Sequence, residues 1–363
     1  MKNRETIIKV LGVILFLYLF LVGIKGLSSG IKHLGGGFAE TVLSTTSNPF
    51  LSLFIGILAT TLFQSSSTTT SIIVSMVSGG AISIPGAIPM IMGANIGTSV
   101  TNTIVSIGHI TRGNEFKRAF AASTVHDFFN ILAVLIIFPL EMMFGFLEKL
   151  STGLGYMLFG TLSTEDSFKS PIKAAVKWGS KHVESLSFGN DIVYIILSVL
   201  LTFAMLYLIV KVLRSLVLSR VEVFFDRYLF RNAFTAMLFG IALTIMVQSS
   251  SITTSTIVPL AGAGVLTLRQ IFPFTLGANI GTTVTALLAS LTLNPIAMVA
   301  AFSHLFFNIF GILIIYPIKP LRTIPLKAAE MIAELSLKSK MIPITYIVLV
   351  FFVLPFIIIY IGG

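Results

Sequence analysis

The feature that most constrains the fold of this chain is a run of hydroxyl side chains inside an apolar stretch, which occurs twice. The first copy reads Gln-Ser-Ser-Ser-Thr-Thr-Thr-Ser and begins at Gln64. The second reads Gln-Ser-Ser-Ser-Ile-Thr-Thr-Ser and begins at Gln248. At a constant offset of 184, residues 64–104 align without a gap to residues 248–288, with 19 identities in 41 positions. Identity at this level shows that the chain contains an internal duplication, which must organise the fold.

The duplication extends on both sides of these blocks. Upstream, the same offset places the apolar residues 10–30 on residues 194–214. Downstream, a loop shorter by six residues changes the offset to 178, and residues 119–139 align to residues 297–317 with 11 identities in 21 positions. Each copy therefore has one apolar helix before the hydroxyl run and further apolar helices after it.

With 55% hydrophobic and 10% charged residues, the chain is predicted to be a helical membrane protein rather than a soluble globule. The apolar residues 51–63, which precede the first hydroxyl run, are too few to cross a hydrocarbon core of about 30 Å. The apolar segment after the run is also short. Two half-length legs that meet at a polar tip indicate a re-entrant hairpin, which is tolerated where it is buried or lines a cavity. We expect such hairpins at residues 50–82 and 234–266.

The predicted fold class is an all-α polytopic membrane protein with two inverted-topology repeats, each with a re-entrant helical hairpin and three spanning helices, plus a C-terminal helix. Three crossings per repeat is an odd number, which turns the second copy upside down in the membrane. The spans after the hairpins are expected at residues 86–108, 119–140, 271–293 and 297–317. The predicted regions are the first repeat (1–140), an extracytoplasmic connector (141–190), the second repeat (191–318), and a cytoplasmic loop with the final transmembrane helix (319–363).

The positions of Lys and Arg predict a cytoplasmic N-terminus in a bacterial-type cytoplasmic (inner) membrane. In this orientation the basic residues within 2–9, 112–118, 211–231 and 319–327 all lie inside, and the outer loop 292–295 has none. Topology then explains the net charge of +10, and no nucleic-acid partner is expected. Because the chain has no cysteine, thiolate sites are excluded, and we expect Na⁺ but no transition metal.

The connector carries a basic stripe formed by Lys169, Lys173, Lys177 and Lys181, which recur every four residues on one helical face. Such a stripe could act as an electrostatic funnel for an anion. It could equally be a solvated or interfacial face, and this is the interpretation that we favour.

The two hydroxyl runs are predicted to form one binding site near the membrane midplane. A half-helix N-terminus offers unpaired N–H groups and the positive end of a dipole, which suits an anion. Hydroxyl groups can donate to that anion, while hydroxyl and carbonyl oxygens can bind a hard cation such as Na⁺. The alternative is that the hydroxyls only join helices together. The predicted phosphate- or sodium-binding residues are Gln64, Ser65, Ser66, Ser67, Thr68, Thr69, Gln248, Ser249, Ser250, Ser251, Thr253 and Thr254.

A second duplicated motif, Gly-Ala-Asn-Ile-Gly-Thr, begins at Gly93 and at Gly277. Paired glycines permit unwinding or close helix approach, so amide and hydroxyl oxygens could sit beside freed carbonyls. The alternative is small-residue packing with the asparagines bonded across helices. We interpret the polar members of the motif as secondary sodium ligands: Asn95, Thr98, Asn279 and Thr282.

An ionisable residue inside a predicted span is a candidate functional group, and Asp127 is such a residue. The matching position in the second copy is Leu305, so the duplication does not require the acid. A cation is its expected partner, and we include Asp127 among the secondary sodium ligands. His126 and Asn130 share one face of a predicted helix, and His304 and Asn308 do the same in the second copy. We interpret both pairs as groups that form hydrogen bonds between helices in the core.

These motifs closely resemble the type II sodium–phosphate cotransporter family. The resemblance rests on both Gln-Ser-Ser-Ser runs, on residues 93–103 and 277–285, and on Thr-Val-His-Asp-Phe-Phe-Asn at 124–130. It implies Na⁺-driven uptake of inorganic phosphate across the lipid bilayer, with Na⁺ as the coupling ion. In that family an acid at the position of Asp127 is associated with electrogenic coupling. The connector looks short and lacks the cysteines of animal members.

Other functions remain open at this point. The chain could be an Na⁺-coupled carrier for another oxyanion, such as arsenate or sulfate, or a passive anion channel. An intramembrane serine hydrolase would need a base beside an activated serine, and neither hydroxyl run has one. We therefore expect no enzymatic activity. The sequence predicts no particular oligomeric state.

Overall fold

In a computed structural model, the chain is described over residues 2–159, 171–221 and 232–362. Within these ranges the regular secondary structure is helical, and no strand occurs. Lys169, Arg227 and Arg231, used above for the stripe and the orientation, lie outside the described residues. In chain order the helices are α1 (Lys2–His33), α2 (Gly36–Thr46), α3 (Pro49–Phe63), α4 (Ser66–Gly79), α5 (Ile84–Gly97), α6 (Val100–Ile107), α7 (Asn114–Phe144), α8 (Phe146–Phe159), α9 (Pro171–Ser185), α10 (Asp191–Val221), α11 (Ala233–Val247), α12 (Ser250–Ser255), α13 (Val258–Gly262), α14 (Leu268–Ser290), α15 (Pro295–Ile315), α16 (Lys319–Lys338), α17 (Met341–Val348), the π-helical turn η1 (Leu349–Val353) and α18 (Leu354–Gly362).

Six helices in the described part of the chain are long and apolar enough to cross a membrane: α1, α7, α10, α14, α15 and the helix formed by α17, η1 and α18. Helices α2 and α3 meet at an angle of 104° and together could form a seventh, broken span. The prediction of an all-helical integral membrane protein is therefore confirmed.

The two hydroxyl runs begin at equivalent breaks between helices. Asn48 caps α3, and its side chain accepts the N–H groups of the first turn. Helix α3 ends at Phe63 because Gln64 adopts the left-handed conformation, with φ 54°. Ser65 then caps α4 by accepting the N–H of Thr68.

The second copy repeats this arrangement at an offset of 184. Asn232 caps α11, Gln248 is left-handed with φ 57°, and Ser249 caps α12 by accepting the N–H of Ile252. Gln64 and Gln248 are two of the three residues other than glycine with positive φ in the described chain. Such a conformation is uncommon for glutamine, so its recurrence marks the tip as a specified structure.

The second leg of the hairpin differs between the copies. In the first copy α4 runs without a break from Ser66 to Gly79, whereas in the second copy the leg is divided into α12 and α13. Pro259 lies in the first turn of α13, at the position that Ser75 occupies in α4. Because proline has no N–H and clashes with the preceding turn, it ends α12 and starts a new helix.

The expected span at residues 86–108 is not one helix, since it is divided at Thr98 and Ser99 into α5 and α6. The hydroxyls of these two residues bond back to carbonyls of their own helix, but Thr282 and Thr283 do the same within the continuous α14, so these bonds do not explain the break. Beyond the break, Asn102 bonds to the side chains of Thr254 and Ser255 in α12. The second copy has alanine in place of Asn102, and α14 is continuous.

The first leg of each hairpin is joined to the following helix by a seam of glycines. A Cβ added at Gly56 would lie 2.0 Å from the carbonyl oxygen of Met90, and one at Gly93 would lie 1.9 Å from that of Leu53. At the corresponding glycines of α11 and α14, Gly240 and Gly277, an added Cβ would lie 2.2 and 2.0 Å from backbone oxygens. Backbones therefore touch along both seams, and no larger residue fits there.

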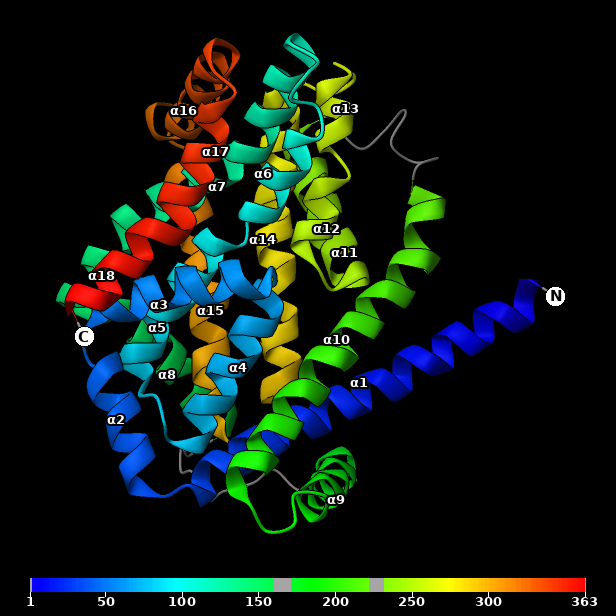
Figure 1. Ribbon diagram of the computed structural model, residues 1–363, viewed down its shortest axis with the longest axis vertical. Coiled ribbons are helices and arrows are strands. Elements are labelled where there is room, and N and C mark those ends of the chain that lie inside the picture. Colours follow the sequence, from blue (N-terminus) through cyan, green and yellow to red (C-terminus); the bar gives the residue numbers. More distant parts are fainter. Residues whose placement is uncertain (1, 160–170, 222–231, 363) are drawn as a thin grey trace.

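Figure 1 shows how the remaining helices surround the hairpins. Helices α1 and α10 lie side by side at the lower end of the molecule and diverge toward their other ends, with α9 packed against both near the lower end. Helix α4 runs from mid-height to the lower end, whereas α12 and α13 run from mid-height to the upper end. The largest apolar core lies among α3, α5, α7, α14, α15 and the last helix.

Candidate functional site

The hydroxyls of Ser66 and Ser250 stand apart from the others at the hairpin tips. Both side chains are buried, with 3% and 2% of their surface exposed. Neither hydroxyl makes a hydrogen bond to another described residue, and the two serines occupy equivalent positions in the duplication. The first turn of a helix also presents backbone N–H groups that have no partner within the helix. Each tip therefore offers a hydroxyl that is free for a ligand.

The other tip hydroxyls are mostly occupied. In the first copy, the hydroxyls of Thr68 and Thr69 bond to the side chain and the carbonyl of Ser65. In the second copy, the hydroxyl of Thr254 bonds to the carbonyl of Ser250 at 2.7 Å. The hydroxyl of Thr253 is buried and has no partner among the described residues.

Both tip glutamines are held by the same pair of hydrogen bonds. The Gln64 amide donates to the Thr61 carbonyl at 2.7 Å, and its Oε1 accepts the Thr101 hydroxyl at 2.8 Å. In the second copy Gln248 donates to the Ile245 carbonyl at 2.7 Å and accepts from Thr285 at 2.9 Å. Sequence reasoning assigned both glutamines to ligand binding. In the structure Gln64 joins the end of α3 to α6, and Gln248 joins the end of α11 to α14.

Each tip also contacts the other copy. The Ser67 hydroxyl lies 3.4 Å from the hydroxyl of Thr285 in α14. The Ser251 hydroxyl donates to the carbonyl of Thr98, at the break between α5 and α6, at 3.3 Å. The structure therefore brings the second tip against the second motif of the first copy, and the first tip against Thr285, three residues beyond that motif in the second copy. The hydrogen bonds do not join one tip directly to the other.

The second motif contributes packing as well as polar contacts. Its glycines form the two seams, and the hydroxyls of Thr98 and Thr282 bond to carbonyls in their own helices at 2.9 and 3.0 Å. Asn279 bonds across helices, while the Asn95 amide donates to the Ile91 carbonyl of its own helix. A role of these residues in binding Na⁺ stays a prediction.

The histidine–asparagine pairs differ between the copies. In the first copy His126 Nε2 bonds to Asn279 Oδ1, Asn279 donates to Asn130 at 2.8 Å, and Asn130 donates to the Asn95 carbonyl at 2.7 Å. This series of hydrogen bonds confirms the predicted bonding between helices for the first copy. In the second copy the prediction is wrong, because Asn308 bonds only to the carbonyl of His304 in the same helix. Among the described residues, neither ring nitrogen of His304 has a partner.

Asp127 is completely buried in the middle of α7, with 0% of its surface exposed. Its Oδ2 accepts the Tyr346 hydroxyl at 2.9 Å and lies 3.5 Å from the Thr103 hydroxyl. Among the described residues Oδ1 has no hydrogen-bond partner, and no Lys or Arg forms an ion pair with the carboxylate. A buried carboxylate with one open oxygen is a plausible ligand for a cation in chemical terms.

Comparison with known proteins identifies the family. The sequence profile of a family described as Na+/Pi-cotransporter matches residues 19–164 and 200–318. The chain belongs to this Na+/Pi-cotransporter family. The Na+/Pi-cotransporter family is a family of transporters and not of enzymes, which confirms the expectation of no enzymatic activity.

Curated relatives of this family member extend over most of its length. Sodium-dependent phosphate transport protein 2B of Homo sapiens is 34% identical over 439 aligned residues, which cover 94% of this chain and 63% of that protein. The 2B protein of Pongo abelii gives the same values. The 2A protein of Ovis aries is 34% identical over 429 residues, covering 96% of this chain and 67% of that protein. The chain thus spans less than two thirds of the length of the 2B relatives. No solved structure matches it at a significant level.

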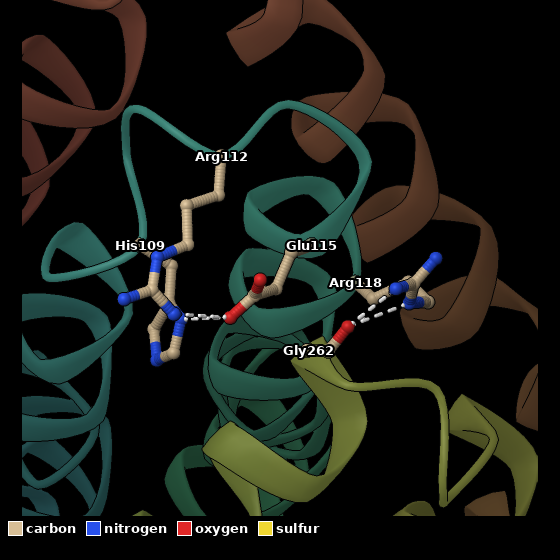
Figure 2. Close-up of polar contacts among 5 residues, drawn as sticks. All are labelled: His109, Arg112, Glu115, Arg118 and Gly262. Atoms are coloured by element: carbon tan, nitrogen blue, oxygen red, sulfur yellow. Dashed lines mark hydrogen bonds and ion pairs between the residues drawn. The ribbon is translucent and has the colours of Figure 1, made fainter.

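A charged cluster at the start of α7 ties this family member's second hairpin to the first copy (Figure 2). The Glu115 carboxylate accepts from Arg112 and lies 2.8 Å from Nδ1 of His109. Arg118 donates from two nitrogens to the carbonyl oxygen of Gly262, at the end of α13. A guanidinium can make this forked contact, whereas a lysine cannot. The end of the hairpin is therefore anchored to α7.

The basic stripe of the cotransporter chain lies on α9, at the lower end of the molecule in Figure 1. Lys177 and Lys181 are exposed. The ammonium group of Lys173 donates to the Leu293 carbonyl at 2.6 Å, and partial burial lowers the pKa of Lys173. These positions fit the interpretation as a solvated or interfacial face.

Four residues with clear contacts in this member of the family were missed by sequence reasoning. Thr101 and Thr285, which hold the glutamines, are identical at the offset of 184, so the duplication carried a signal for them. Asn102 corresponds to Ala286, and Tyr346 lies beyond both copies, so neither shows in the alignment of the copies.

Proposed function

We propose that this protein is a sodium-coupled secondary active transporter that imports inorganic phosphate. Substrate and Na⁺ would bind between the two Gln-Ser-Ser-Ser tips near the membrane midplane. The observation that carries the proposal is the pair of buried, unpartnered hydroxyls of Ser66 and Ser250 at equivalent positions of the two copies. The curated relatives are described as sodium-dependent phosphate transport proteins, which supports the same substrate and coupling ion here.

The chemistry of the tips suits an oxyanion together with a hard cation. Serine hydroxyls and the N–H groups at the start of α4 can donate to phosphate oxygens. No Lys or Arg lies within α3, α4, α11 or α12, so Na⁺ must contribute to neutralising the bound anion. Carbonyl and hydroxyl oxygens at the tips and at the break after Gly97 are suitable ligands for Na⁺.

The proposed architecture consists of two inverted repeats, residues 1–140 and 191–318, with hairpins that enter from opposite sides. The opposite directions of α4 and of α12–α13 in Figure 1 support this arrangement. So do the packing of α8 against α15 and of α16 against α7, because α8 and α16 follow equivalent helices of the two copies. Binding between inverted repeats is typical of secondary transporters.

Asp127 would make transport electrogenic. Phosphate near neutral pH is largely divalent, so two Na⁺ would leave the cycle neutral and a third would move net positive charge inward. Asp127 would offer the third ion a negatively charged ligand. Further oxygen ligands would come from the side chains of Asn95, Thr98, Asn279 and Thr282. We place the N-terminus in the cytoplasm of a bacterial-type inner membrane, with α9 outside, following the distribution of basic residues.

The test is uptake of radiolabelled phosphate into proteoliposomes that hold the purified protein, with an inward gradient of Na⁺, Li⁺, K⁺ or H⁺. Uphill accumulation driven by Na⁺ is expected. Flux that only follows the phosphate gradient would instead establish a passive channel. Accumulation of sulfate with no competition from phosphate would assign the site to another oxyanion. Arsenate, which has the same shape and charge, should compete with phosphate.

A further inference from the structure

The shortest hydrogen bond to the carboxylate of Asp127 comes from the last helix of the chain, and Ser99 and Thr103 supply further hydroxyls near it. The Tyr346 hydroxyl lies 2.9 Å from Oδ2, whereas the Thr103 hydroxyl is at 3.5 Å and also lies 3.2 Å from the Ser99 carbonyl. Tyr346 belongs to α17, which follows both copies of the duplication. The acid and its donor are thus both outside the internal symmetry, since Asp127 is replaced by Leu305 in the second copy.

Aromatic side chains fix the tyrosine ring in place. Phe120 and Phe128 of α7 lie 6.4 and 6.1 Å from the ring of Tyr346, between centroids. Phe351 meets the ring edge to face, at 6.0 Å and 89°. Phe351 is fully buried and lies in the π-helical turn η1, which interrupts the last helix one turn after Tyr346. A π-helical turn is rare and is frequent at functional sites, and here it directs Phe351 onto the tyrosine.

We infer that Tyr346 is a positioning residue that stabilises the Na⁺-free, charged form of Asp127 and so permits the ion to leave its site. The inference rests on the proposed function, in which Asp127 binds Na⁺. A buried carboxylate without a cation is costly at membrane depth, and a donor that remains in place lowers that cost. The cation then approaches Oδ1, the oxygen that Tyr346 does not occupy.

The arrangement has a consequence for affinity and turnover. A hydrogen bond to the empty carboxylate stabilises the ion-free state more than the ion-bound state, because bound Na⁺ already neutralises the charge. Without the hydroxyl, Na⁺ should bind more tightly and leave more slowly. A merely structural tyrosine would behave differently, since damage to packing weakens binding and lowers the rate together.

The test is the Tyr346→Phe variant, which keeps the ring and removes the hydroxyl, measured in proteoliposomes at alkaline pH to keep the carboxylate unprotonated. We expect the Na⁺ concentration for half-maximal phosphate uptake to fall about three- to tenfold, with a lower maximal rate. Tyr360→Phe is the matched control, because Tyr360 lies in the same last helix, is 80% exposed and stacks on Phe356. It should leave both values unchanged.

Two further variants separate the explanations. In an Asp127→Asn background, Tyr346→Phe should have no additional effect on the Na⁺ dependence, and an effect of equal size there would overturn the inference. Thr103→Val removes the longer contact and should shift the Na⁺ dependence in the same direction, but less. If Tyr346→Phe is not recovered in membranes, Thr103→Val alone provides the test, and weaker Na⁺ binding by either variant contradicts the inference.

Failure of this inference can be told apart from failure of the proposed function. A wild-type protein that shows no Na⁺-driven phosphate uptake would remove the proposed function and the inference together. Wild-type uptake with an altered Na⁺ dependence in Asp127→Asn, but not in Tyr346→Phe, would remove only the role of the tyrosine.

Discussion

The hydroxyl oxygens of Ser67 and Thr285 lie 3.4 Å apart, although 218 positions separate the two residues in the chain. Thr285 also holds Gln248 at 2.9 Å, so one threonine joins the tip of the second hairpin to the tip of the first. Its counterpart Thr101 holds Gln64 at 2.8 Å. The two copies are therefore coupled through the residues that shape their tips.

This coupling makes Thr285→Val more damaging than Thr101→Val. Both substitutions keep the shape of the side chain and release one glutamine, but only the first also removes the contact with Ser67. Each lost hydrogen bond is worth about 1 kcal/mol. Initial rates of phosphate uptake, normalised to the amount of protein in the membrane, should fall further for Thr285→Val. Equal rates for the two variants would show that the contact between the copies carries no weight.

Removing the free tip hydroxyls should weaken binding. Ser66→Ala and Ser250→Ala each delete a hydroxyl that has no partner in the described chain, so the change affects the ligand rather than the fold. We expect the phosphate or Na⁺ concentration for half-maximal uptake to rise about five- to tenfold in each. Ser71→Ala is the matched control, because the Ser71 hydroxyl is buried and bonded to the Ser67 carbonyl at 2.7 Å. Wild-type kinetics in both test variants would disprove a shared site.

Asp127→Asn keeps the shape of the side chain and removes its charge. Transport should continue at a reduced rate but lose its response to an imposed membrane potential, together with part of its cooperativity for Na⁺. The control is Glu141→Gln, since Glu141 is also a buried acid of α7, and its carboxylate accepts the N–H groups of Leu147 and Glu148 at 2.7 and 3.1 Å. That variant should alter stability but not voltage dependence. Full voltage sensitivity in Asp127→Asn would exclude the acid from charge coupling.

The glycine seams predict a difference between two Gly→Ala substitutions. Gly93→Ala places a methyl group against the Leu53 carbonyl, so α3 and α5 must separate, at a cost of about 1–3 kcal/mol or more. A Cβ at Gly153 in α8 meets no atom within 4 Å, so Gly153→Ala should be neutral or slightly stabilising. Thermal unfolding in detergent measures both. Similar unfolding temperatures for the two variants would contradict the close contact of the backbones.

The orientation can be tested with single cysteines, because the chain has none of its own. Ser185, at the end of α9, and Thr111, between α6 and α7, are both exposed. Helix α9 lies at the lower end of the molecule in Figure 1, and the connection between α6 and α7 lies at the upper end. An impermeant thiol reagent added to intact cells should label Ser185→Cys and leave Thr111→Cys unlabelled until the membrane is opened. The reverse pattern would invert the proposed topology.

Much of the fold could be predicted because the two copies of the duplication can be aligned with each other. The recurrence of Gln-Ser-Ser-Ser located both helix breaks to within a residue. That the short helices beside these breaks enter the membrane without crossing it stays a prediction. The division between α5 and α6 was not predicted. The difference between the copies beside it is Asn102, which is Ala286 in the second copy and bonds to a segment 152 residues away. The break after α12 was predictable in principle from Pro259, which has no counterpart in α4.

The candidate site shows the same division. Hydroxyl chemistry identified Ser66 and Ser250, but composition alone cannot distinguish a hydroxyl that is free from one that caps a helix, as Ser65 does. The glutamines were assigned to the ligand because an amide can both donate and accept, and only the positions of Thr61 and Thr101 show that these capacities are used within the protein. The partner of Asp127 lies beyond both copies, where the duplication carries no information.

The two glycine seams also determine where the molecule can yield. Along each seam backbones touch, and there is no room even for a methyl group, so we expect α3 with α5 and α11 with α14 to behave as two stiff helix pairs. Between these pairs the copies meet at the tips through side-chain hydrogen bonds. They include the bonds of Asn102 to Thr254 and Ser255 at 2.7 and 2.8 Å and the hydroxyl contacts of 3.3 and 3.4 Å. Water can take the place of such bonds, but not of the packed seams. We therefore expect the contacts between the copies to open before the seams do. Each hairpin would move with the helix pair to which it belongs, and the proposed ligand would lie between the pairs.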